Sequence, residues 1–212
     1  MSKPNRAAAW LELLTATGLV LSYIWVWQGS FPGDFVVCLA LFLAIALWGH
    51  RRRGETARDL GFRLDNLRES ATLVFSFVAP LVVLMVIVGL ALGLNREPPV
   101  PRLLTRVILI PLFGVAQEYA LLGFYLRRFE EALPGRWLPV LASATVFALL
   151  HAPNSILMGL TLLISLGACW LYRKAPNLWV LGLAHGLLSI TVAMFLAKLL
   201  IFGLKVGPRV LR

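Results

Sequence analysis

Residues 103–128 read LLTRVILIPLFGVAQEYALLGFYLRR, an apolar stretch that holds a single carboxylate, Glu118. A helix needs about 20 predominantly apolar residues to cross the hydrocarbon core of a membrane. The stretch is long enough, so it predicts a membrane-spanning helix. Ionisable side chains inside a membrane are costly and mark functional sites by default. This stretch therefore indicates both the class of fold and the place at which function should be sought.

The rest of the chain has the same apolar character. Of its 212 residues, 59% are hydrophobic and 14% are charged, and the mean hydropathy is +0.83. An ordinary soluble domain has about a quarter of its residues charged. We expect an all-α, polytopic transmembrane helical bundle that forms a single membrane domain over residues 1–212. Its seven expected spans are 7–28, 31–49, 71–94, 103–128, 137–151, 155–172 and 178–201.

The basic residues are distributed unevenly between the spans. The net charge is +10, and most lysines and arginines lie before span one or after spans two, four and six. Positively charged connections stay in the cytoplasm and meet anionic lipids, so we expect a cytoplasmic N-terminus and membrane lipids as partners. Nucleic acid is not an expected partner, because no basic segment is interleaved with aromatic residues in a soluble module.

The charged connector over residues 50–70, HRRRGETARDLGFRLDNLRES, allows two interpretations. Its apolar residues lie near helical spacing, as in an amphipathic helix on the lipid headgroups. It is equally compatible with a solvated loop. The sequence does not choose between them.

Two histidines lie in apolar stretches, as Glu118 does: His151 in FALLHAPN and His185 in LGLAHGLLS. Each of the three could have a structural role, the histidines bonded to a neighbouring backbone or hydroxyl group and Glu118 to a histidine or Tyr125. Together, on three separate stretches, they predict one polar site inside the bundle. Gly114, four residues before Glu118, is expected to let another helix approach closely.

One carboxylate and two imidazoles support three kinds of chemistry. They can activate water for peptide-bond hydrolysis, bind a divalent metal such as zinc, or form the proton path of a transporter. The residue types alone do not decide among these, although paired repeats typical of transporters are not evident. The protease motifs HExxH and GxSxG are absent from the sequence.

The order and spacing of three motifs resemble the CAAX-processing and bacteriocin-processing (CPBP) family of intramembrane endopeptidases. That family has Glu-Glu-xxx-Arg-Gly, Phe-xxx-His and His-xxx-Asn/Asp on successive helices. The matching positions here are Gln117-Glu118 with Leu122-Gly123, Phe147 with His151, and His185 with Ser189. The resemblance covers about residues 103–200 as a catalytic core. It implies a bacterial inner-membrane protease of the CAAX type that hydrolyses membrane-associated peptides or proteins near the membrane surface.

The resemblance also implies roles for individual residues. His151 would activate water and His185 would stabilise the oxyanion, with Glu118 central and Gln117 and Ser189 bordering the site. Gln117 replaces a glutamate of the family, and an amide cannot act as a general base.

Leu122 replaces the arginine that would pair with Glu118. Two hypotheses follow from these departures. In both, Glu118 could be protonated or paired with His151 or His185 once the arginine is lost. Either Glu118 has taken over as the base, or the bundle is a catalytically silent binding or scaffold protein.

A further expectation concerns how deep the three candidate residues lie in the membrane. His151 ends its span, whereas Glu118 and His185 lie mid-span, so a joint site requires a tilted or displaced fifth helix.

The remaining polar residues of the spans are expected to be structural. Glu12, Arg106 and Lys198 should extend to the interface. Cys38 and Cys169 should be buried, small apolar residues.

Overall fold

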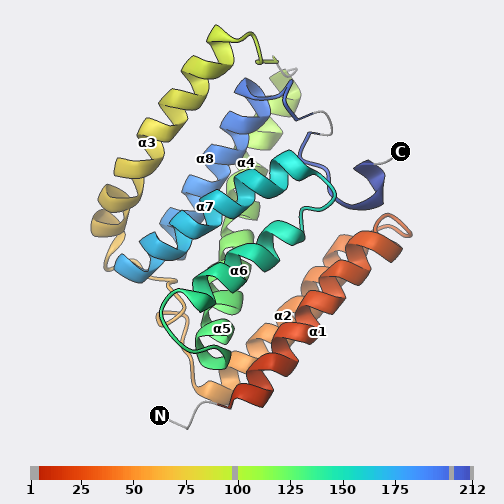
Figure 1. The fold of residues 1–212 in the computed structure, drawn as a ribbon, viewed down its shortest axis with the longest axis vertical. Helices are drawn as coiled ribbons and strands as arrows, with labels where there is room; N and C mark the ends of the chain where they lie inside the picture. The colour runs from red at the N-terminus through yellow and green to blue at the C-terminus, as the bar shows by residue number, and fades with distance from the viewer. Residues whose placement is uncertain (1–4, 97–99, 201–202, 211–212) are drawn as a thin grey trace.

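The computed structural model describes residues 5–96, 100–200 and 203–210, which form helices joined by turns and loops, without a strand among them (Figure 1). The predicted all-α class is confirmed. In chain order the helices are α1 (Arg6–Ser22), α2 (Asp34–Arg53), α3 (Leu67–Ala91), α4 (Val100–Glu118), α5 (Arg127–Ala132), α6 (Leu138–Leu149), α7 (Ser155–Lys174) and α8 (Leu178–Phe195). Two π-helical segments, η1 (Tyr23–Trp27) and η2 (Tyr119–Leu126), and the 3-10 turn η3 (Gly207–Val210) complete the set.

Six of the seven expected spans are long and apolar enough to cross a membrane by length and composition. They are Arg6–Trp27, Asp34–Arg53, Leu67–Ala91, Leu109–Ala132, Ser155–Lys174 and Leu178–Phe195. The prediction for 137–151 is wrong in length, because α6 has only 12 residues. At 1.5 Å per residue it is about 18 Å long, well short of the roughly 30 Å of hydrocarbon. Pro139 lies in its first turn, and a turn at residues 150–153 follows it.

Helices α4 and α8 pack against each other backbone to backbone. A Cβ atom on Gly114 would lie 2.4 Å from the carbonyl oxygen of Gly182, and one on Gly186 would lie 2.6 Å from Cα of Pro111. Neither position therefore accepts a side chain without movement of the helices. The expected close approach at Gly114 is confirmed, and it sets the end of α4 against the middle of α8. α8 also packs on α3, and α7 packs on α6, in front of α4 in the view of Figure 1.

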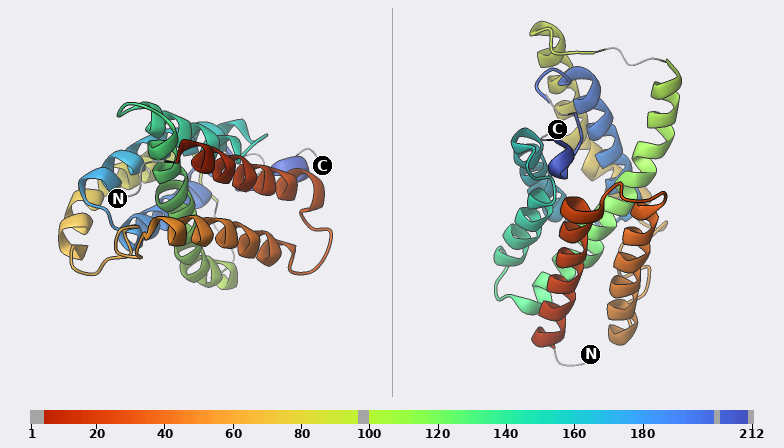
Figure 2. Two further views of the ribbon diagram at one scale, coloured as in Figure 1. Left: turned by 90° about the horizontal axis from the view of Figure 1, so that it is seen from below. Right: turned by 90° about the vertical axis from the view of Figure 1, so that its right-hand side faces the viewer.

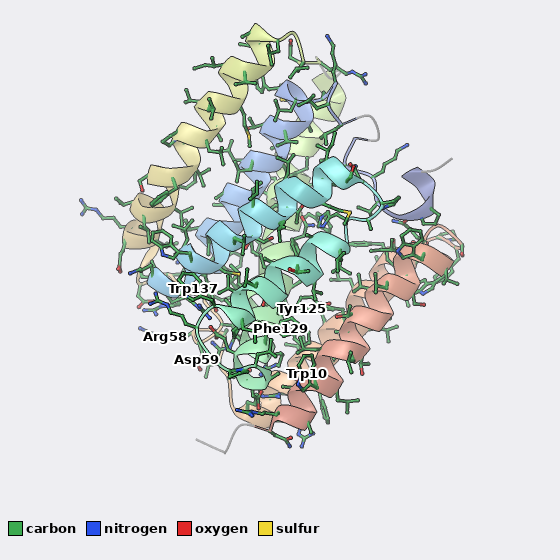
Figure 3. All side chains as sticks on the ribbon, viewed as in Figure 1. Trp10, Arg58, Asp59, Tyr125, Phe129 and Trp137 are labelled. Atoms are coloured by element: carbon green, nitrogen blue, oxygen red, sulfur yellow. The ribbon has the colours of Figure 1, made fainter. Side chains whose placement is uncertain are left out.

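Positive charge gathers at one end of the molecule. The start of α1, the end of α2, the loop 54–66, α5 and the end of α7 meet there; we call this the arginine-rich end. Figure 2 shows the start of α1, the end of α2 and α5 lying together at this end. Trp10 of α1 packs edge to face on Phe129 of α5, with ring centroids 6.0 Å apart (Figure 3).

The connector between α2 and α3 is a loop with turns over residues 54–66, so the amphipathic-helix interpretation is wrong. The loop is bonded to the junction of α7 and α8. The Leu178 amide donates to the Gly61 carbonyl at 2.8 Å, and the Tyr172 hydroxyl donates to the Leu60 carbonyl at 3.0 Å. Gly61 has φ +91°, a conformation that favours glycine. These bonds to main-chain carbonyls of the loop hold it against the bundle even though its arginines reach solvent.

A buried ionic cluster joins α1, α2 and α5 at this end. Glu12 is only 3% exposed, and its carboxylate lies 2.8 Å from Nη1 of Arg53 and 3.1 Å from Nε of Arg128. Arg53 Nε also lies 2.6 Å from Glu131. The expectation that Glu12 extends to the interface is wrong, because two arginines from other helices neutralise it inside the protein.

The third histidine, His50, belongs to the same cluster. It is 2% exposed, with Nδ1 2.6 Å from Glu55 Oε2 and Nε2 3.1 Å from the Tyr119 hydroxyl. Glu55 also pairs with Arg127 and Arg128. Burial raises the pKa of the Glu55 carboxyl, but the hydrogen bonds from His50 and Arg128 and the charges of both arginines outweigh it and lower that pKa to about 2.

Other sequence expectations have simple outcomes. Cys38 and Cys169 are buried, as predicted. Lys198 is exposed, as predicted, and its Nζ donates to the Gly93 carbonyl at 2.5 Å. The side chain of Arg106 lies outside the described part of the structure.

Candidate active site

Glu118 and His185 form a hydrogen-bonded pair between α4 and α8. Glu118 is the last residue of α4, 2% exposed, and its Oε1 lies 2.7 Å from Nδ1 of His185. An ionised Glu118 carboxylate would only accept in this bond, and a neutral His185 would then carry its proton on Nδ1 and keep the lone pair on Nε2. The expectation that Glu118 pairs with a histidine is confirmed, and the partner is His185. The Tyr125 hydroxyl instead bonds to Thr17, at 3.2 Å.

The backbone changes its winding directly after Glu118. The π-helical segment η2 begins at Tyr119, and π-helical turns within α-helices are frequent at functional sites. A Cβ atom on Gly123 would lie 2.8 Å from the ring of Tyr119, so only glycine fits beneath that ring. Because the Tyr119 hydroxyl bonds to His50, the ionic cluster is connected to the turn that positions Glu118.

His151 lies in the turn that follows α6. Its Nδ1 is 2.8 Å from the carbonyl oxygen of Phe147. A carbonyl only accepts, so this bond places the proton on Nδ1 and leaves Nε2 as the free nitrogen. The two rings lie edge to face, with centroids 5.3 Å apart. Phe147 is 4% exposed and belongs to the hydrophobic core, so core packing fixes the orientation of the histidine.

A cavity of about 140 Å³ brings the candidate residues together; we call it the polar cavity. Gln117, His151, His185 and Ser189 all line it, with Thr161, Ser165 and apolar side chains around them. The volume accommodates several water molecules. His151 lies just after the end of α6 and lines the same cavity as His185. The tilt or displacement of the fifth helix stays a prediction.

A second cavity, of about 200 Å³, also has His185 in its lining; we call it the apolar cavity. It opens between α3, α7 and α8, and its only ionisable lining residues are Glu118 and His185. Glu118 Oε2 has no hydrogen-bond partner among the described residues. His185 therefore lines both cavities, whereas Glu118 lines only the apolar one, where one of its carboxylate oxygens is unpartnered among the described residues.

The carboxylate and imidazoles do not gather as a ligand set. Within the described residues, no three His, Cys, Asp or Glu side chains come close enough together to hold a metal ion. Glu118 and His185 bond to each other, and His151 bonds to a carbonyl oxygen. The zinc site suggested by the residue types stays a prediction.

The replaced motif position, Leu122, is fully buried among apolar side chains of the core. His185 contacts the carboxylate for which the family pattern would supply an arginine. Both residues of this pair could be predicted from the sequence, but which histidine Glu118 contacts could not. The roles of His50 and Arg128 were not predicted either, because both lie beside other arginines, in HRRR and YLRR, and looked like solvated charges.

Comparison with known proteins finds one family match. Residues 98–191 match the family model described as "Type II CAAX prenyl endopeptidase Rce1-like", a segment that contains all three motifs. No curated protein and no solved structure matches the chain. The resemblance to the CPBP proteases is thereby confirmed. Six apolar helices and a membrane-protease family together identify an integral membrane protein and point to peptide-bond hydrolysis.

Proposed function

We propose that this protein is an intramembrane endopeptidase of the CAAX-protease type, in which the Glu118–His185 pair activates the attacking water. The 2.7 Å bond between Glu118 Oε1 and His185 Nδ1, beside a cavity that His151 also lines, is the observation that supports this most. The proposed substrate is a membrane-associated peptide or protein. The proposed location is a bacterial inner membrane, with the arginine-rich end in the cytoplasm.

In this mechanism His185 is the general base. Glu118 holds the imidazole in the tautomer that exposes Nε2 and stabilises the imidazolium that forms when Nε2 takes a proton from water. This assignment differs from the family expectation, in which His151 activates water and His185 stabilises the oxyanion. The reason is that, of the two histidines that line the polar cavity, His185 bonds to a carboxylate and His151 bonds to a neutral carbonyl oxygen, and a carboxylate can stabilise the imidazolium that the base becomes.

The other residues of the polar cavity have supporting roles. The water oxygen bonds to the peptide carbon, and the negative charge on the carbonyl oxygen requires donors. The amide of Gln117 and the hydroxyl of Ser189 line the cavity and can donate. His151 orients the water through Nε2. The imidazolium of His185 then returns its proton to the leaving amine as the C–N bond breaks.

Cleavage of a membrane-tethered peptide library by the purified protein in nanodiscs tests the proposal. We expect Glu118→Leu and His185→Ala to reduce turnover about 10²- to 10⁴-fold, the usual contribution of general acid–base catalysis. Glu69→Gln, at an exposed position on α3, is the matched control and should cleave as the wild type does. Thermal unfolding of each variant checks that the bundle is intact.

The same assay tests the silent-homologue hypothesis. A library that the wild type leaves uncut, but that Gln117→Glu/Leu122→Arg cleaves, would show a binding protein descended from a protease and overturn the proposal. Cleavage that persists in a folded His185→Ala variant would overturn the assignment of the base.

A further inference from the structure

A small cavity lies where α6 begins and α7 ends, away from the polar and apolar cavities; we call it the basic cavity. Its volume is about 120 Å³, and it is lined by Arg136, Trp137, Val140, Trp170, Arg173 and Lys174. Figure 3 labels Trp137, which lies just before the first residue of α6. The cavity belongs to the arginine-rich end, beside the final turn of a spanning helix.

Three cations converge on this cavity, and no carboxylate lines it. Arg173 is the one with a counter-ion: its Nη2 lies 2.6 Å from Glu130, and its Nη1 donates to the Arg136 carbonyl at 2.7 Å. Arg136 and Lys174 make no ion pair with any described residue. Like charges held close together repel, so the arrangement is favourable when an anion shares the space.

Each of the two unpaired cations lies near the ring of a tryptophan. The guanidinium carbon of Arg136 lies 5.4 Å from the ring centroid of Trp137, and Nζ of Lys174 lies 6.0 Å from that of Trp170. A cation over an aromatic face is attracted by the ring and loses freedom. The cations are therefore oriented before a ligand arrives, which lowers the entropic cost of binding.

The position of the cavity indicates the source of the anion. Tryptophan and basic residues at the end of a spanning helix mark the depth of the lipid headgroups. Trp137 is 58% exposed, so one wall of the cavity faces the surroundings of the bundle. A headgroup phosphate would meet the cations while its acyl chains extended along α6 and α7.

We infer that the basic cavity binds the phosphate group of an anionic phospholipid. The negative charge of Glu130 offsets the positive charge of Arg173. The charges of Arg136 and Lys174 remain, and they match a phosphodiester of charge −1 together with a further anionic or hydroxyl group of the lipid head. Guanidinium groups suit phosphate oxygens in geometry and charge. Basic pockets between spanning helices are a general form of lipid recognition.

Native mass spectrometry of the full-length protein in non-ionic detergent tests this inference. The protein is titrated with phosphatidylglycerol and, separately, with phosphatidylcholine of the same acyl chains. We expect one phosphatidylglycerol to be retained in preference to phosphatidylcholine. Arg136→Ala/Lys174→Ala should weaken that retention about thirtyfold, since each of the two basic residues near a headgroup contributes about 1 kcal/mol.

The matched control is Arg51→Ala/Arg52→Ala. It removes two positive charges at the same end, and Arg52 likewise lies over a tryptophan, 4.6 Å from the ring of Trp48, but neither residue lines the basic cavity. Retention should survive in this variant. Equal loss in both double variants, or no preference for phosphatidylglycerol, would overturn the inference.

A competition arm distinguishes a lipid from a soluble phosphate. Inorganic phosphate in millimolar excess should leave the bound phosphatidylglycerol in place, because it lacks the acyl chains. Displacement by inorganic phosphate would identify a site for soluble phosphate and contradict the assignment to a lipid.

Discussion

Glu118 and His185 are 67 positions apart in the chain, and their side chains meet at 2.7 Å, carboxylate oxygen to imidazole Nδ1. The contact depends on the glycine-lined approach of α4 to α8, which leaves no room for side chains between the two backbones. It engages Nδ1 of the imidazole and so leaves Nε2 as the nitrogen that the proposed function uses. The proposed chemistry follows from this one relationship.

The tautomer of His185 can be measured without a substrate. In protein labelled with ¹⁵N-histidine, we expect His185 to be protonated at Nδ1 at neutral pH. Glu118→Leu removes the acceptor, so the Nε2-protonated form should appear in the NMR spectrum. The resonance of His50, whose partners are Glu55 and Tyr119, serves as the internal control and should not change. A His185 signal that is unaltered in Glu118→Leu would contradict the pairing.

The packing of α4 on α8 should be sensitive to a single methyl group. In Gly114→Ala the new Cβ would lie 2.4 Å from the Gly182 oxygen, and overpacking of this kind costs about 1–3 kcal/mol. We expect a lower unfolding temperature by tryptophan fluorescence in detergent. Gly159→Ala, on α7 with nothing within 4 Å of the added atom, is the control and should keep or slightly raise that temperature. Equal stability of the two variants would show that the helices are not in contact here.

Because of the ionic cluster, the free energy of unfolding should depend on pH in the acidic range. The pKa of Glu55 falls from 4.5 to about 2 in the folded protein. Its stabilising contribution is therefore complete above the unfolded value of 4.5 and is lost as the pH falls from there toward 2. At pH 7 we expect Glu55→Gln to be less stable by about 2–3 kcal/mol, measured by denaturation in detergent.

At pH 3 the difference between Glu55→Gln and the wild type should shrink to less than half of its value at pH 7, because the unfolded carboxyl is then protonated. Glu69→Gln, at an exposed position, controls for general charge effects. A constant difference across this pH range would show that the carboxylate of Glu55 is not stabilised by its partners.

Removal of divalent metal distinguishes two of the chemistries that the residue types allow. We expect cleavage to continue in EDTA, because the Glu118 and His185 atoms that face each other are engaged in a hydrogen bond. Loss of cleavage in EDTA with recovery on added Zn²⁺ would instead support a zinc site. Incubation with Mg²⁺ in place of Zn²⁺ is the control for a general ionic effect.

Several features could be predicted from the sequence because they depend on local composition. Hydropathy located the six long helices, and the motifs located His151, His185 and Glu118. The length of α6 was not predicted, because an apolar run continues from 137 to 150 and only the tertiary structure shows where the helix ends. The burial of Glu12 in an ionic cluster was not predicted for a similar reason: its partners, Arg53 and Arg128, are 41 and 116 positions away in the chain.

The sequence by itself determined that the chain is a helical membrane bundle and that a carboxylate and two histidines lie in its apolar stretches. It could not decide which histidine Glu118 contacts, since spacing along a helix places a residue on a face but not opposite a particular neighbour. The tertiary structure decided this through the close approach of Gly114 to Gly182 and the early end of α6. A buried charge is stabilised by the groups that surround it in space, and those come from different helices.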